Sequence, residues 1–587
     1  MVMGKHVGLA LVSLAVLVSV PVTATPAPAP ATTAPSQPAP AYDIVLRGGT
    51  IYDGSGKPGV KGDVAIRGER IVYVGPRAPG GAKTVIDARG MAIAPGFINM
   101  LSWGIESLIA DGRGLSELKQ GVTLQVFGEG ESMGPLTPAM KADMVRRQSD
   151  LRYSVEWTSL GEYLDWLAKR GVSQNIASYV GAATVRTNVL GESDVDPDAA
   201  QLARMRALVA AEMRQGALGV GSSLIYAPAS YAETPELIAL VEEAARCDGA
   251  YISHMRSEGD RLLEAIDELV EIARATGARA EIYHFKQAGR DNWHKIDAAI
   301  ARVEAARREG LKVTADMYPY DVAGTGLDAA MPTWVQSGGL EAWIEQLRKP
   351  GIRARVIAEM KAPGVGWENM YRAAGGAEGM IAVGFKNEKL KPLSGKTIAE
   401  IAAMRGTSPE DTIIDLVIED GSRVGTLYRL MDETNVARAT SLPWMSFGSD
   451  AGAQAPEGAF LKSRPHPRAY GTFARVLGKY SRDEKRLSLA EAVRRMSALP
   501  AANLALRERG SLKPGYYADV VVFDPKTVAD RATVENPWAL ATGVRDVFVN
   551  GTAALRDGEP MRARPGQVVR GPGWTGWPGG GACKPPK

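Results

Sequence analysis

The middle of the chain alternates short apolar runs with amphipathic helical segments. The apolar runs are GVTLQVFGEG, GAYISHMR, ARAEIYHFK, LKVTADMYPY and LPWMSFGSD. Apolar residues recur at three-to-four spacing over 262–273 and again over 296–306, which predicts two helices between consecutive strands. Two successive βαβ units of about thirty residues each favour a right-handed parallel arrangement. The fold class expected is α/β, a (β/α)₈ TIM-type barrel.

A barrel of about 250 residues does not fill a chain of 587 residues. Strand-like segments with Gly-rich turns occupy 42–95, and similar segments return at 509–556. They predict either one small β-sandwich domain built from both ends of the chain or two separate β caps. The barrel is placed at 96–508, with an insertion over its mouth at 331–441. A Gly/Pro-rich tail follows at 557–587.

The N-terminus is typical of an exported protein. A basic start, an apolar run and small residues predict a signal peptide at 1–24, cleaved after Ala24, and an Ala/Pro-rich linker at 25–41. The apolar run is too short to favour a retained membrane span. We therefore expect a periplasmic or secreted protein. Export permits a disulfide, but Cys247 and Cys583 are only one distant pair, and Cys583 is expected to be peripheral.

Polar side chains end several of the predicted strands. Glu129, His254, His284 and Asp450 each follow an apolar run, at the end of a parallel strand where barrels collect their functional groups. Two imidazoles and a carboxylate suit a hydrolytic zinc ion that keeps a position open for water. Asp450 could take a proton from that water. A single strand-end histidine is more often a core group, but two in consecutive βαβ units favour metal binding.

Other motifs carry less information. The glycine-rich segment 128–134 matches neither dinucleotide nor Walker A spacing. His294 is expected at the surface, and His466 either lines the mouth or belongs to a plain turn. The net charge of +3 and the absence of basic runs interleaved with aromatic residues argue against a nucleic-acid partner.

The chain from Tyr42 to about Thr552 resembles the N-acyl-D-amino-acid deacylase (D-aminoacylase) family of the amidohydrolase superfamily. The motifs that carry the resemblance are APGFI, QGVT, SSLIYAPASYA, YISHMRSEG, IYHFKQAG, TADMYPY, GSDAG and HPRAYGTFARVLGKY. The resemblance implies one tightly held zinc ion, bound by a strand-three ligand that is usually cysteine and by histidines on strands five and six. The matching residues are Glu129, His254 and His284.

The same resemblance assigns further roles. It makes Asp450 the catalytic aspartate, implies that Lys286 and Arg468 grip the substrate carboxylate, and places Tyr226 in LIYAP against the substrate. The substrate expected is an acylated amino acid, with the D form favoured by the resemblance alone, or a related dipeptide. An oligomer is compatible with the sequence.

The sequence departs from the family pattern in two places. The superfamily ends its first strand in HxH, whereas this chain has Leu101 and Trp103 at those positions, so no second ion can be anchored there. The strand-three cysteine is also replaced. Matching from the downstream side puts Glu129 at the ligand position, and matching from the upstream side leaves Glu131 as the rival. Trp103 either fills volume, narrows the pocket or stacks on an acyl group.

These residues leave two main functional hypotheses. The first is a mononuclear zinc amidohydrolase, favoured because the four positions Glu129, His254, His284 and Asp450 all hold competent residues. The second is a non-catalytic binding descendant of the fold, for which the loss of HxH is the argument. A dinuclear peptidase of the same superfamily is weakened by Leu101 and Trp103.

Overall fold

The computed structural model describes residues 10–17 and 41–585. Most of the predicted signal peptide (1–24) and linker (25–41) lies outside these residues, and the described part of the former, 10–17, forms neither helix nor strand. Within the described ranges, no helix combines the length and the apolar character that crossing a membrane requires.

Parallel strands form the barrel. The first three-stranded run is β6 (Phe97–Asn99), β7 (Val122–Phe127) and β8 (Asn175–Ser178). The second is β9 (Val180–Gly181), β10 (Gly219–Ser223), β11 (Ala250–His254), β12 (Arg279–Ile282) and β13 (Val313–Ala315). Only Tyr179 separates β8 from β9, so the two act as one barrel strand. Parallel bridges from Ala315 to Met445 and from Ser102 to Ala451 close the ring.

This ring confirms the predicted (β/α)₈ barrel and corrects one strand number. The strand that precedes Glu129, β7, is the second barrel strand and not the third, because it pairs directly with β6 on one side and β8 on the other. Sequence patterning missed β8 and β10. Their sequences, NIAS and GVGSS, lack the run of large apolar residues that marked the other strands.

Both helices predicted between barrel strands are present. Helix α8 (Leu262–Thr276) buries one face, which includes Leu262, Ile266, Leu269 and Ala273. It ends at Gly277, whose left-handed backbone glycine adopts most easily. Helix α9 (Ile296–Arg308) likewise buries Ile296, Ala299, Ile300, Val303 and Ala306. Burial of these stripes against the strands holds the strand ends in place.

The two ends of the chain build one sheet. A nine-stranded sheet has the order β20-β19-β18-β17-β5-β1-β2-β3, with β4 paired to β1. Its N-terminal strands are β1 (Tyr42–Ile51), β2 (Val60–Arg67), β3 (Arg70–Gly75), β4 (Ala82–Asp87) and β5 (Ala92–Pro95). The C-terminal strands are β17 (Val520–Phe523), β18 (Val544–Val549), β19 (Thr552–Arg556) and β20 (Glu559–Pro560). Antiparallel pairing of β5 with β17 joins the two sets, which favours the first of the two predicted arrangements.

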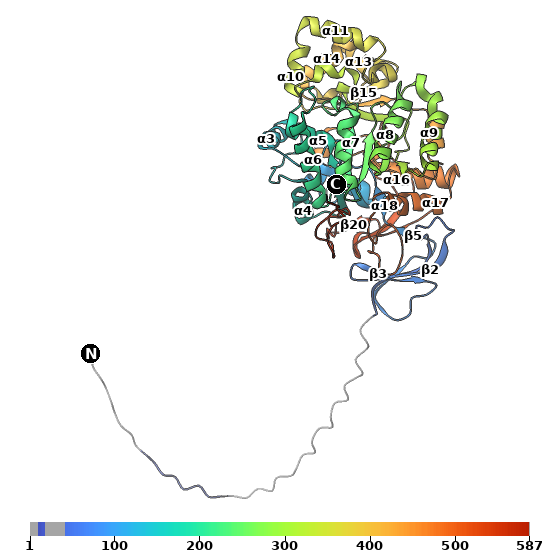
Figure 1. Cartoon of the computed structure of the whole chain (residues 1–587). Helices are drawn as coiled ribbons and strands as arrows, with labels where there is room; N and C mark the ends of the chain where they lie inside the picture. The colour runs from blue at the N-terminus through green and yellow to red at the C-terminus, as the bar shows by residue number, and fades with distance from the viewer. Residues whose placement is uncertain (1–9, 18–40, 586–587) are drawn as a thin grey trace, which may run out of the picture. The chain divides into compact units, whose positions relative to one another are not determined.

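The region after β13 contains a second, smaller sheet. Strands β14 (Val322–Gly326), β16 (Gly425–Arg429) and β15 (Met380–Gly384) pair antiparallel in that order. Helices α10 (Leu340–Leu347), α11 (Pro350–Lys361), α13 (Ile398–Arg405) and α14 (Pro409–Asp420) accompany it, as Figure 1 shows around β15. The insertion predicted at 331–441 therefore contains the two strands β15 and β16 as well as helices. The three strands are short and rich in glycine, so their pattern is weak.

The C-terminal tail packs against the barrel. Val569 N–H donates to Ile176 O, and Ile176 N–H donates to Gln567 O, so the tail runs beside β8. Cys583 forms a disulfide with Cys247, 336 positions earlier in the sequence. Cys583 is thus less peripheral than its Gly/Pro-rich surroundings suggested.

Candidate metal centre

The predicted site residues lie where barrel strands end. His254 is the last residue of β11, while Glu129 and His284 each stand two residues beyond β7 and β12. Asp450 lies in the closing segment, where its N–H donates to Leu101 O at 2.8 Å. His284 (φ 35°) and Asp450 (φ 48°) adopt left-handed backbone conformations that are uncommon for residues other than glycine. Such conformations persist where the surroundings over-determine them, as at functional sites.

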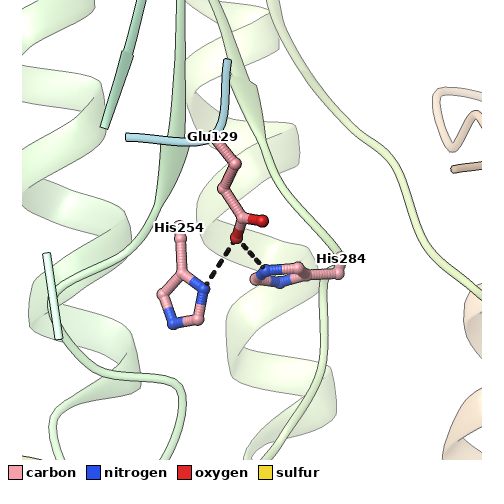
Figure 2. Close-up of side chains that lie close together, drawn as sticks. All are labelled: Glu129, His254 and His284. Atoms are coloured by element: carbon pink, nitrogen blue, oxygen red, sulfur yellow. Dashed lines mark hydrogen bonds and ion pairs between the residues drawn. The ribbon is translucent and has the colours of Figure 1, made fainter. Parts of the chain in front are cut away.

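Three ligand-type atoms converge at this rim (Figure 2). Oε1 of Glu129 lies 3.0 Å from Nδ1 of His254 and 2.8 Å from Nε2 of His284. The ligand atoms of the three residues all lie within 4.8 Å of one another, and all three side chains are buried. The structure therefore brings Glu129, His254 and His284 together, whereas Glu131 stays outside this cluster.

The donor set fits a zinc ion. One carboxylate and two imidazoles are a common three-ligand set for catalytic zinc. Each short contact between a ring nitrogen and Oε1 requires a proton in between, and a cation can take the place of such protons. The other ring nitrogen of His254, Nε2, has no hydrogen-bond partner among the described residues although it is buried. This nitrogen lies 3.8 Å from Oε2 of Glu258.

The charges of the cluster favour a cation. Burial opposes ionisation of Glu129, but His284 and His254 hold the pKa of its carboxyl well below the usual range. Burial lowers the pKa of His254. Burial and Lys286 oppose protonation of His284, yet Glu258 and Glu129 outweigh them and raise its pKa to about 10. A buried, ionised carboxylate thus stands between two ring nitrogens.

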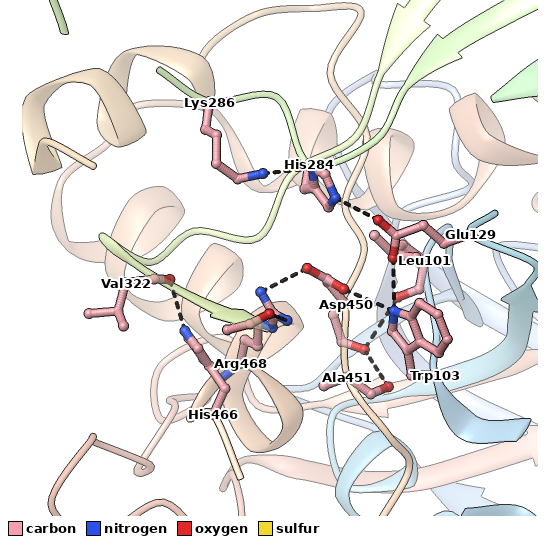
Figure 3. A network of polar contacts seen from close by, with 12 residues as sticks. Leu101, Trp103, Glu129, His284, Lys286, Val322, Asp450, Ala451, His466 and Arg468 are labelled. Atoms are coloured by element: carbon pink, nitrogen blue, oxygen red, sulfur yellow. Dashed lines mark hydrogen bonds and ion pairs between the residues drawn. The ribbon is translucent and has the colours of Figure 1, made fainter. Parts of the chain in front are cut away.

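Glu258 supports the far side of His284. Its Oε1 lies 2.9 Å from His284 Nδ1 and 2.6 Å from Lys286 Nζ, and only 2% of its surface is exposed. Lys286 Nζ also lies 2.6 Å from His284 Nδ1 (Figure 3). A carboxylate beyond a ligand histidine fixes the orientation of the ring. Sequence analysis missed Glu258, although it stands four residues after His254 within the quoted motif YISHMRSEG.

Asp316 is a second residue that sequence analysis did not single out. Its Oδ1 accepts the backbone N–H of His284 at 2.9 Å, and the side chain is fully buried. Burial raises the pKa of Asp316 well above its usual range. Its place at the end of β13, one residue beyond Ala315, was the available signal.

Asp450 faces the cluster and is held by one ion pair and one hydrogen bond (Figure 3). Nη1 of Arg468 lies 2.7 Å from Oδ2, and the indole N–H of Trp103 donates to Oδ1 at 3.1 Å. Burial raises the pKa of Asp450 to about 6 against the opposing charge of Arg468. Asp450 therefore shares a cavity with the three converging residues without being one of them.

A cavity of about 730 Å³ opens onto these groups. Its lining includes Tyr226, Lys286, Arg468, Glu131 and Arg423, together with the four predicted centre residues. The ring of Tyr226 stands 5.1 Å from that of His254. All the predicted substrate-binding residues thus border one space.

The remaining two histidines of the described chain differ. His466 is buried and lines the cavity, where its Nε2 lies 2.8 Å from Val322 O (Figure 3). His294 is exposed in a short 3₁₀ segment, as expected for a surface residue.

A parallel barrel that gathers two imidazoles and a carboxylate at its strand ends, beside a buried aspartate, defines the architecture of a metal-dependent hydrolase. Comparison with known families is in accord: residues 84–554 match the amidohydrolase family, and the chain belongs to it.

Individual relatives support a narrower grouping. A D-aminoacylase of Alcaligenes xylosoxydans xylosoxydans is 32% identical over 526 residues, covering 89% of this chain and 96% of the relative. A crystal structure of D-aminoacylase superposes with a TM-score of 0.75 at 32% identity, over 90% of this chain and 100% of that one. The N-acyl-D-glutamate deacylase of Bordetella bronchiseptica, solved with zinc and a phosphonate inhibitor, gives 0.74 at 30% identity, over 90% and 99%.

Proposed function

We propose that this protein hydrolyses the amide bond of N-acyl amino acids, with N-acyl-D-amino acids as the preferred class. The observation that carries the proposal is the convergence of Glu129, His254 and His284 on one point of the cavity that Asp450 also borders. The D preference is supported by the relatives, which include a D-aminoacylase and an N-acyl-D-glutamate deacylase.

Glu129, His254 and His284 would hold a single zinc ion. When bound at such a site, zinc lowers the pKa of a water molecule and polarises a carbonyl oxygen. Leu101 is apolar and buried beside the centre, and Trp103 offers only an indole N–H, so neither provides a ligand for a second ion. This supports the mononuclear arrangement.

Asp450 is the proton carrier of the proposed reaction. Its carboxylate accepts a proton from the attacking water and returns it to the nitrogen that leaves, so the amide C–N bond breaks while a new C–O bond forms. Arg468 and Trp103 hold its two oxygens by separate contacts, which fixes the direction in which the carboxylate faces.

Lys286, Arg468 and Tyr226 are proposed to bind the substrate. Both cations border the cavity, and a substrate carboxylate is the group that they would orient. Lys286 is already paired with Glu258, and Arg468 with Asp450. An incoming carboxylate would therefore join two existing ion pairs and not meet free charges.

The protein is further proposed to act outside the cytoplasm. The N-terminal pattern described above is one support. The Cys247–Cys583 disulfide is another, because such bonds persist in oxidising compartments.

A hydrolysis panel tests the proposed activity. Purified, zinc-loaded protein is given N-acetyl-D- and N-acetyl-L-amino acids with apolar and acidic side chains, together with dipeptides, and release of the free amine is followed. Turnover of the D series supports the proposal. Turnover of dipeptides alone would favour a peptidase, and no turnover with zinc bound would favour a binding protein. His254→Ala and His284→Ala should each lose zinc and turnover, and His294→Ala is their matched control, because that side chain is exposed and outside the cavity.

A further inference from the structure

One indole N–H lies between two acidic side chains of the site. Trp103 Nε1 donates to Oε2 of Glu129 at 2.8 Å and to Oδ1 of Asp450 at 3.1 Å (Figure 3). Glu129 is 5% exposed and Asp450 8% exposed, so both carboxylates are largely buried. The N–H is therefore shared between two largely buried carboxylates.

The remaining oxygens of both carboxylates are also engaged. Oε1 of Glu129 faces the two imidazoles, and Oδ2 of Asp450 faces Arg468. Trp103 thus contacts the other oxygen of each carboxylate, Oε2 of Glu129 and Oδ1 of Asp450. Removing its N–H would leave two largely buried acceptor oxygens without this donor, which costs free energy.

The backbone fixes Trp103 relative to Asp450. Trp103 N–H donates to Ala451 O at 2.9 Å, and Asp450 N–H donates to Leu101 O at 2.8 Å. These bonds belong to the closure of the barrel, in which Ser102 pairs with Ala451. The indole and the aspartate therefore sit on two chain segments that are tied together next to the site.

An indole suits this place chemically. It donates a hydrogen bond but neither accepts one nor titrates near neutral pH. It can therefore orient both carboxylates without competing for the proton that Asp450 carries. If the ring only filled space, phenylalanine would serve as well.

We propose that Trp103 is a positioning residue, whose indole N–H bridges the metal-binding carboxylate of Glu129 and the catalytic carboxylate of Asp450. Through this bridge it sets the orientation of Glu129 toward the ion and the orientation of Asp450 toward the substrate. This inference rests on the proposed function only for the expected change in turnover. The expected change in zinc affinity can be measured without any substrate.

The test removes the N–H and keeps the ring. Trp103→Phe is compared with a variant carrying benzothienylalanine at position 103, which replaces the N–H by sulfur in a ring of the same shape and guards against misfolding of the phenylalanine variant. Trp444→Phe is the matched control, because Trp444 is buried, lies outside the cavity and has no partner for its N–H in the described part of the chain. Zinc affinity is measured by chelator competition, and kcat and KM with the best substrate of the panel.

We expect both Trp103 variants to bind zinc about ten-fold more weakly, because loss of a ligand's supporting hydrogen bond typically costs about 10- to 100-fold in affinity or activity. We expect kcat to fall by a similar factor while KM changes less than about threefold, because Trp103 is not one of the proposed substrate-binding residues. Trp444→Phe should leave zinc affinity and kcat unchanged. Unchanged zinc affinity in the benzothienylalanine variant would overturn the proposal. If the wild-type protein hydrolyses nothing on the panel, the proposed function fails, and zinc affinity still decides the role of Trp103.

Discussion

At the scale of single residues, the site is built from groups that would be unfavourable elsewhere. Buried carboxylates are costly unless they are paired, and His284 and Asp450 also carry left-handed backbones. The side chains of these two residues are each paired with an opposite charge: His284 with Glu258, and Asp450 with Arg468. Glu117, whose carboxylate neighbours Asn99 and Ser449, lacks such a charge partner.

Glu117 predicts a measurable pH dependence of stability. It is fully buried in α2 (Leu115–Leu118), and burial raises its pKa to about 8. In the unfolded chain it titrates near pH 4.3. Because the folded pKa is the higher one, its contribution to stability is fully present below about pH 4.3 and is lost as the pH rises toward about 8.

We therefore expect Glu117→Gln to lose less stability than the wild type between pH 5 and pH 8, by up to about 1.4 kcal/mol per pH unit. Denaturant unfolding of both proteins across this range measures the difference. Parallel pH profiles for the two proteins would show that Glu117 does not titrate as described.

At the scale of elements, the long apolar patterns of helices α8 and α9 predicted both helices correctly. The four residues predicted at strand ends, Glu129, His254, His284 and Asp450, all line one cavity. Sequence reasoning did not find β8 or β10, because short strands of small residues carry no period. Nor could it find the contacts of Glu258 and Trp103, which are set by how separate strand ends meet in space.

The small sheet after β13 contributes a charged wall to the cavity. Arg423 precedes β16, pairs with Asp328 at 2.8 Å and lies 5.0 Å from the centre of the Tyr226 ring. Because Arg423 borders the cavity away from the converging ligands, it is expected to act on binding and not on the chemical step.

Arg423→Ala should therefore raise KM about five- to tenfold and leave kcat nearly unchanged, the pattern of lost uniform binding. Arg429→Ala, at the other end of β16 and outside this cavity, is the matched control. Steady-state kinetics on both variants measure the effect. A large loss of kcat in Arg423→Ala would place this residue in the chemistry instead.

At the scale of the whole molecule, distant parts of the sequence meet repeatedly. Strand β5 pairs with β17, the tail runs beside β8, and Cys583 is bonded to Cys247. The disulfide closes a very long loop, which restricts the unfolded chain more than the folded one.

Reduction of the disulfide should lower the melting temperature and leave kcat unchanged. Cys247→Ser and Cys583→Ser should each destabilise the protein by about 2–4 kcal/mol, and the double variant by no more than either alone. Thermal melts with and without reductant measure this. A reductant effect on the double variant as large as that on the wild type would exclude the disulfide as its cause.

The proposed function depends on one metal ion, held by Glu129, His254 and His284, that works with Asp450. The decisive test is the Asp450→Asn variant. Its turnover is measured on a preparation whose zinc content has been determined. We expect about one zinc ion per chain, as in the wild type, and a kcat lowered by a factor of about 10²–10⁴, the usual contribution of a general acid or base. Wild-type turnover by this variant, or two zinc ions per chain, would contradict it.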